Sequence, residues 1–290
     1  MWYYSIMENK KIAILTDSSC DINDEMAKEL DIHVLRMPIV VDGKSYIEGV
    51  DIDLNGLKEL FKAGKFAKTS QSTLGDLVNK YEELLKEYDE IIHIPLSSGL
   101  SGMYQTAYML AQNYDNRIVV VDAKHACYPV TLLCLEAKKL LKEGKDIFEI
   151  KELIEKHAEL TATIIPQDIN YLKLGGRITA AAASLANLLK IVPILLLKNG
   201  VIDVYDKVRT EKRAIQRGIE PLLDTDNYSD YYWMIIHDER LEEAEVLKAQ
   251  LEEITKEEVS IQKFGPVILS HTGPGTLAFG RIRKIINDKN

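Results

Sequence analysis

The chain has 290 residues, of which 46% are hydrophobic and 28% charged, a composition typical of soluble globular proteins. The formal charge of −9 argues against general nucleic-acid binding, which needs a basic surface. The longest apolar runs are shorter than the roughly 18–20 residues of a membrane span, so we expect at most transient membrane contact. Three scattered cysteines, with no zinc-like Cys/His spacing, favour a cytoplasmic protein without a metal.

The first half of the sequence alternates short apolar runs with helical patterns. The runs predict strands at residues 11–16, 34–41, 90–96 and 118–122, and the patterns predict helices at 22–30, 54–63, 74–88, 103–113 and 130–142. Continuous apolar strands that alternate with helices are typical of a parallel sheet covered on both faces. We therefore expect an α/β domain with a mainly parallel sheet in this half.

The second half has a different pattern. Asn199-Gly200 is a strong hairpin signal and predicts antiparallel pairing of residues 191–197 with 201–205. Further strands are predicted at 161–165, 231–237 and 260–270, and helices at 180–190, 211–223 and 241–254. This mixture predicts a second α/β domain with a mixed sheet. The charged helix at 147–159 marks the expected boundary, which gives domains at 10–158 and 159–290.

A serine- and glycine-rich motif, Ser97-Ser98-Gly99-Leu100-Ser101-Gly102, follows the strand predicted at 90–96 and precedes a helix. Hydroxyls and backbone N–H groups at such a position can hold an anion, so Ser98 and Ser101 are candidate ligand residues. An equally good interpretation is that one serine only caps the helix. The motif is not the nucleophile elbow of hydrolases, because Ser101 does not stand in a G-x-S-x-G pattern.

Three further motifs stand beside apolar runs. Thr69-Ser70-Gln71 precedes the helix predicted at 74–88, and capping of that helix is the alternative to a ligand role. Gly175-Gly176-Arg177 combines flexible backbone with a cation that can pair with a carboxylate or phosphate, although a surface arginine in a loop explains it too. His271 is a candidate ligand residue, and a hydrogen-bonded histidine at a strand end is the alternative.

Residues 190–217 form a basic segment within an acidic chain. Seven basic residues stand against three acids there, so the segment has a net charge of +4. A solvated helix face is the ordinary meaning of such a run. The functional interpretation is a docking patch for an acidic partner or a phosphate-bearing ligand, and its candidate residues are Lys207, Arg209, Lys212 and Arg213.

In their order and spacing these motifs resemble those of the DegV family, over nearly the whole chain. The resemblance rests on Thr69-Ser70-Gln71, Ser97-Ser98-Gly99-Leu100-Ser101-Gly102, Gly176-Arg177-Ile178-Thr179 and Lys207-Val208-Arg209-Thr210. Two positions depart from the family pattern. Met103 stands where a small or hydroxylic residue is usual, and Ser72 stands where proline is common. Neither departure removes a candidate ligand group.

The resemblance implies a lipid carrier rather than an enzyme, with no catalytic residue and no cofactor. A long-chain fatty acid would lie in a buried tunnel between the two domains, its carboxylate at Thr69 and Ser101 with Ser98, Arg177 and His271 close by. The protein would present that carboxylate to the catalytic subunit of a fatty acid kinase. The resulting acyl phosphate would pass to an acyltransferase of phospholipid metabolism. From its charge, we hypothesise that the patch around Arg209 docks this kinase or guides the phosphorylated head group.

A second hypothesis is an enzyme that acts on a small phosphorylated or carboxylated substrate. Ser101, His271 and Arg177 would then be catalytic. This hypothesis requires His271 within hydrogen-bond reach of a serine hydroxyl, and a third group that orients the imidazole.

Overall fold

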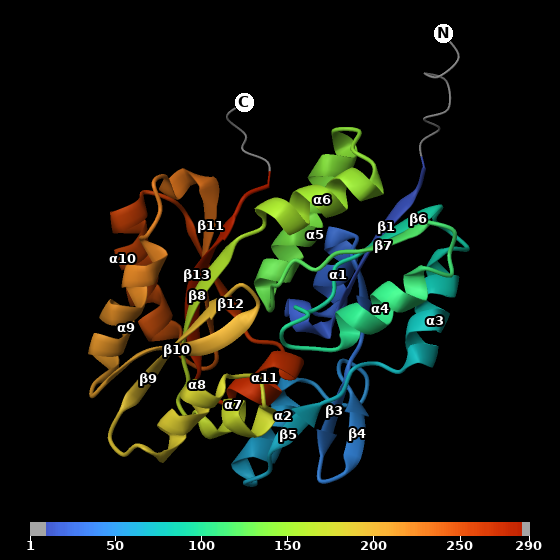
Figure 1. The fold of residues 1–290 in the computed structure, drawn as a ribbon. Helices are drawn as coiled ribbons and strands as arrows, with labels where there is room; N and C mark the ends of the chain where they lie inside the picture. The colour runs from blue at the N-terminus through green and yellow to red at the C-terminus, as the bar shows by residue number, and fades with distance from the viewer. Residues whose placement is uncertain (1–9, 286–290) are drawn as a thin grey trace.

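The computed structural model describes residues 10–285. The first half contains a four-stranded, wholly parallel sheet in the order β2-β1-β6-β7 (Figure 1). Its strands are β1 (Ile12–Asp17), β2 (His33–Leu35), β6 (Glu90–His93) and β7 (Ile118–Val120). The helices of this half are α1 (Asp24–Leu30), α2 (Leu54–Lys62), α3 (Leu74–Leu84), α4 (Met103–Ala111), α5 (Tyr128–Lys142) and α6 (Ile147–His157). The predicted parallel sheet is confirmed.

Strand residues with opposite orientations build two separate cores. Ala13 and Leu15 of β1 belong to a core with residues of α3 and α4, whereas Ile14 packs in another core with α5. Successive side chains of a strand point to opposite faces, so a continuous apolar strand needs helices on both. This explains why the parallel strands are short apolar runs without alternation.

A three-stranded antiparallel sheet, which the sequence did not predict, is inserted in the chain between β2 and β6. Its order is β4-β3-β5, with β3 (Pro38–Val41), β4 (Lys44–Ile47) and β5 (Ala67–Thr69). The single strand predicted at 34–41 is wrong, because the chain leaves one sheet and enters another before Pro38. At this break Met37 N–H donates to Ser18 Oγ, and Ser72 Oγ donates to Arg36 C=O. Side chains thus satisfy backbone groups that a continuous strand would have paired.

The second half contains a six-stranded mixed sheet in the order β10-β9-β8-β13-β11-β12, in which only the β11–β12 pair is parallel. Its strands are β8 (Leu160–Ile165), β9 (Val192–Lys198), β10 (Val201–Val208), β11 (Tyr231–His237), β12 (Val259–Lys263) and β13 (Leu277–Arg283). The predicted β9–β10 hairpin is confirmed, since Asn199 and Gly200 both have positive φ in its turn. Helices α9 (Glu211–Ile219) and α10 (Leu241–Thr255) pack on one face.

Two predictions for this half are wrong. The strand expected at 260–270 ends at Lys263, and residues Pro266–Thr272 form helix α11. Proline suits the first turn of a helix because its missing N–H would have no partner there. The helix expected at 180–190 is only α8 (Ala180–Ser184), followed by a 3₁₀ turn, and helix α7 (Asn170–Gly175) was not predicted.

The two halves meet through α11. This helix belongs to the second half but packs against β5, β3 and α2 of the first (Figure 1). Lys58 of α2 also forms an ion pair with Asp238, with 2.5 Å between Nζ and Oδ1. The exact domain boundary at residues 158 and 159 stays a prediction. Within residues 10–285 no helix is both long and apolar enough to span a bilayer.

Candidate ligand-binding site

A narrow apolar cavity lies between the halves. The space that the centre of a water molecule can reach inside it is about 80 Å³. Since one water needs about 10–15 Å³ by this measure, the cavity has room for a few water-sized groups. Its apolar wall comes from the inner face of the mixed sheet, from α11 and from the loop before α4, and includes Met37, Leu100, Ala162, Met234, Ile236, Phe264, Val267, Ile268, Ala278 and Phe279.

Polar side chains from four separate segments meet at this cavity. Thr69 ends β5, Ser101 precedes α4, Arg177 follows α7 and His271 lies in the last turn of α11; all four line the cavity. The His271 Nε2 atom lies 2.6 Å from Thr69 Oγ1. The Ser101 hydroxyl accepts the Met103 N–H at 3.1 Å, a bond that leaves its own proton for another acceptor. The first and second halves therefore each supply two groups.

His271 is buried and uncharged. Only 9% of its surface is exposed, and its Nδ1 has no hydrogen-bond partner among the described residues. Burial, with a smaller contribution from the nearby Arg177 charge, lowers the pKa of His271 to about 4. Gly175 makes room for the ring, since a Cβ at that position would lie 2.5 Å from Nδ1. The Gly175-Gly176 motif thus has a steric role that the sequence did not specify.

Arg177 brings positive charge to the same place. Its guanidinium donates to the Gly175 carbonyl and, from Nε at 3.3 Å, to the Leu100 carbonyl. It forms no ion pair with any carboxylate in the described part of the chain. An arginine that is held by carbonyls keeps its charge available to an anion.

Ser98 lies elsewhere. Its side chain is exposed, its Oγ donates to Asp122 Oδ2 at 2.6 Å, and it is not part of the cavity wall. The structure thus brings four of the five candidate residues together and separates the fifth. Two polar wall residues were not proposed from the sequence: Gln71, which stands in a recognised motif, and Thr272, which follows His271.

The tip of the β9–β10 hairpin fixes the loop that carries Ser101. Ser97 Oγ lies 3.4 Å from the Gly200 carbonyl oxygen, and a Cβ on Gly99 would lie only 2.3 Å from that same atom. The contact therefore excludes any side chain at Gly99. The hairpin belongs to the second half and the loop to the first, so this contact also joins the halves.

The basic segment lies at the end of β10 and the start of α9. Lys207, Arg209, Lys212 and Arg213 are all exposed, and none forms an ion pair with a described residue. The neighbouring acids have other partners: Asp206 pairs with Arg217, and Glu211 with Arg240. The four cations thus form a basic patch on the surface, and their docking role stays a prediction.

The arrangement does not suit the enzyme hypothesis. His271 contacts a threonine rather than a serine, and no group in the described part of the chain orients the imidazole through Nδ1. A base with a pKa near 4 also accepts protons poorly at neutral pH. Among residues 10–285, no cluster of three or more His, Cys, Asp or Glu side chains is arranged to hold a metal.

Known proteins share this fold over almost its full length. A DegV protein from Bacillus subtilis, described as a fatty acid binding protein, has a crystal structure with 34% identity and a TM-score of 0.80, covering 95% of this chain and 100% of that one. A fatty acid binding DegV family protein from Streptococcus agalactiae has 33% identity and a TM-score of 0.82, covering 95% and 99%. These neighbours are described as binding proteins rather than as enzymes.

Sequence comparison gives the same result. A DegV domain-containing protein of Streptococcus pneumoniae is 34% identical over 278 residues, covering 94% of this chain and 99% of its own length. The DegV family model matches residues 11–284. The chain belongs to the DegV family.

Proposed function

We propose that this protein binds one long-chain fatty acid, with the chain in the apolar cavity and the carboxylate at Thr69, Ser101 and His271. The observation that carries the proposal is an apolar cavity with a cluster of hydrogen-bonding groups in its wall. Apolar pockets with a few convergent polar groups are typical ligand sites. The fatty acid binding described for the Bacillus subtilis and Streptococcus agalactiae relatives supports the assignment.

The hydrophobic effect supplies the affinity. Burial of a methylene group stabilises a complex by about 0.8 kcal/mol, so a chain of about 14 methylenes contributes roughly 11 kcal/mol before the costs of binding. The polar groups then decide the orientation of the ligand. Carboxylate oxygens can accept hydrogen bonds from the Ser101 hydroxyl and from the Thr69–His271 pair.

The neutral character of these donors suits a second role. Because Thr69, Ser101 and the neutral His271 are uncharged, they can orient the carboxylate without a full salt bridge, and Arg177 keeps its charge for a further anionic group. A carboxylate held by neutral donors stays more nucleophilic than one neutralised by a cation. We infer that the protein presents this carboxylate to the catalytic subunit of a cytoplasmic fatty acid kinase, and that the acyl phosphate passes to an acyltransferase. Arg177 would then stabilise the phosphorylated head group.

The binding proposal is tested by mass spectrometry of lipid extracted from the purified protein. Wild-type protein should release a fatty acid, and a Thr69→Ala, Ser101→Ala double variant should retain clearly less, since each lost donor weakens binding by about 1–3 kcal/mol. Ser98→Ala is the matched control, because Ser98 bonds to Asp122 outside the cavity. Equal lipid content in the double variant and the control would contradict the proposed carboxylate site.

The docking proposal is tested separately. Arg209→Ala should leave the lipid content unchanged and slow phosphorylation by the partner kinase, and the wild-type rate should fall as salt is added. Lys86→Ala, which removes an exposed charge from another surface, is the control. The Arg209→Ala variant could instead contain less lipid, while the kinase phosphorylates its remaining lipid-bound fraction at the wild-type rate. Arg209 would then belong to ligand binding.

A further inference from the structure

A second, wider cleft opens between the two halves. The space that water centres can reach in it is about 930 Å³, against about 80 Å³ in the apolar cavity. One wall consists of the start of α1 and the loop before α2, and the opposite wall consists of the start of α10 and strand β12 with the residues up to Pro266. The proposed fatty acid site does not use this cleft.

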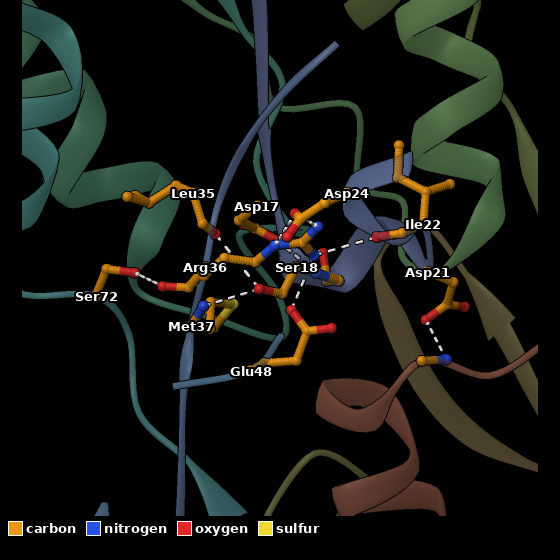
Figure 2. A network of polar contacts seen from close by, with 12 residues as sticks. Asp17, Ser18, Asp21, Ile22, Asp24, Leu35, Arg36, Met37, Glu48 and Ser72 are labelled. Atoms are coloured by element: carbon orange, nitrogen blue, oxygen red, sulfur yellow. Dashed lines mark hydrogen bonds and ion pairs between the residues drawn. The ribbon is translucent and has the colours of Figure 1, made fainter. Parts of the chain in front are cut away.

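The cleft is acidic. Six carboxyl side chains and two cationic ones line it, and of the six Asp21 is uncharged at neutral pH because burial raises its pKa to about 8. One of the cations, Arg36, is already neutralised, because its guanidinium pairs with Asp24 and Glu48 and also donates to the Ile22 carbonyl (Figure 2). The exposed Glu25 and Glu245 form no ion pair with any described residue. The surface therefore favours a positively charged occupant.

Strand β12 presents a free edge to this cleft. It is the last strand of the mixed sheet, and within residues 10–285 it pairs only with β11. The Phe264 N–H donates to the His237 carbonyl of β11 at 3.3 Å, so the alternation along a strand turns the N–H groups of Ile261 and Lys263 outward. The Val259 N–H, which also points outward, donates to Glu252 Oε1 at 3.0 Å. Neither Ile261 N–H nor Lys263 N–H has a hydrogen bond to the described residues.

A buried histidine at the same level of the sheet also lacks a partner. His237, which pairs in register with Lys263, is 2% exposed and lines the cleft. Its Nδ1 accepts the Arg240 N–H at 3.1 Å, so the proton of the neutral ring is on Nε2. That atom has no hydrogen-bond partner among residues 10–285. A buried donor without an acceptor is costly and is expected to be satisfied by a bound group.

We propose that a partner protein inserts an extended, lysine- or arginine-rich segment into this cleft and adds it as a strand to the free edge of β12. Backbone pairing with Ile261 and Lys263 would give affinity, as in other cases of strand addition. Charge complementarity with Glu25 and Glu245 selects basic side chains.

Two other occupants fit less well. Pairing of β12 with β12 of a second copy would bring two acidic clefts together, and like charges in contact are unfavourable. An anionic lipid surface would be repelled by the same carboxylates. Both occupants are outcomes of the test below.

The probe is an acetylated and amidated peptide of alternating lysine and valine, five residues long, with a glutamate–valine peptide as its control. Amide hydrogen exchange followed by NMR should show that the lysine peptide slows exchange at Ile261 and Lys263 by roughly tenfold at saturation, since strand pairing protects the outward amides. Affinity should fall at least about fivefold in a Glu25→Gln, Glu245→Gln variant. The matched control is Glu253→Gln with Glu258→Gln, which removes the same charge from exposed positions outside the cleft.

Two substitutions at Lys263 separate backbone pairing from charge. Lys263→Pro removes the outward N–H of Lys263, which forms no ladder bond to β11, and should abolish binding of the peptide. Lys263→Ala keeps the N–H, removes a repelling charge and should bind at least as well as wild type. Equal peptide binding by Lys263→Pro and Lys263→Ala would overturn the proposal. Equal losses of affinity in the Glu25/Glu245 variant and in the Glu253/Glu258 control would overturn it as well. So would protection of the outward amides by self-association, measured by sedimentation, or by vesicles of anionic lipid. Unchanged melting temperature and lipid content verify that each variant is folded.

Discussion

The apolar cavity and the acidic cleft both lie between the two halves, yet they provide opposite environments. The cavity is small and mostly apolar, and it holds His271 in its neutral form. The cleft is more than ten times larger by the same measure and is rimmed by carboxylates. The comparison shows that one interface between two sheets can build a dry site and a wet one, depending on which side chains cross it.

The contacts that hold the halves together also differ between the two sites. Beside the cavity, Gly99 of one half packs directly against the Gly200 carbonyl of the other, and His271 Nε2 lies 2.6 Å from Thr69 Oγ1. Beside the cleft the contacts are polar: Asp21 Oδ1 accepts the Gly265 N–H of the other half at 2.9 Å (Figure 2). Close packing tolerates no added atom, whereas a polar contact responds to pH. Each side of the interface can therefore be broken by a different change.

The largest effect is expected from Gly99→Ala. The added methyl group would meet the Gly200 carbonyl oxygen at 2.3 Å, and backbone on both sides must shift. We expect the free energy of unfolding to fall by about 1–3 kcal/mol. Bound fatty acid should also be lost, because the loop that carries Ser101 moves. Urea denaturation and lipid extraction measure the two effects. Gly75→Ala, whose Cβ has an ordinary 3.7 Å contact in α3, is the control, and an equal response of both variants would refute the steric explanation.

The effect expected at the cleft from Asp21→Asn is a change in how stability depends on pH. Burial raises the pKa of the Asp21 carboxyl from 3.8 to about 8, so between these values the folded state holds a proton that the unfolded state has released. Stability must then fall as pH rises through this window, by at most about 1.4 kcal/mol per pH unit from this group. Asparagine cannot titrate, and the variant should lose this part of the slope. Denaturation midpoints from pH 4 to 9 test it, and parallel profiles for both proteins would contradict it.

The smallest effect is expected from His271→Gln at the cavity, with the opposite sign. Burial lowers the pKa of His271 from 6.5 to about 4, so the unfolded state binds the extra proton in this window. The contribution of His271 is therefore present above pH 6.5 and is lost as pH falls toward 4. Without bound lipid, the His271→Gln variant should lose less stability than the wild type as pH falls from 6.5 to about 4. If stability below pH 6.5 depended on pH in the same way in both proteins, His271 would have the same pKa in the folded and unfolded states.

Local patterns predicted much of the architecture. The apolar runs at β1, β6 and β7 indicated the parallel sheet, and Asn199-Gly200 indicated the β9–β10 hairpin, because each signal depends on residues that are neighbours in the chain. The wrong predictions arose where residues that are distant in the sequence determine the local structure. The break before Pro38 depends on Ser18 and Ser72, which bond the backbone of Arg36 and Met37.

The candidate site shows the same division. The sequence by itself determined which side chains bear the chemistry: hydroxyls at Thr69 and Ser101, a cation at Arg177 and an imidazole at His271. Only the tertiary structure decided which of them meet, because Thr69 and His271 are 202 positions apart in the chain and contact through the packing of α11 on β5. It also directed Ser98 to Asp122, left the edge of β12 open, and set the charge of His271 and Asp21, since burial is a property of the folded chain.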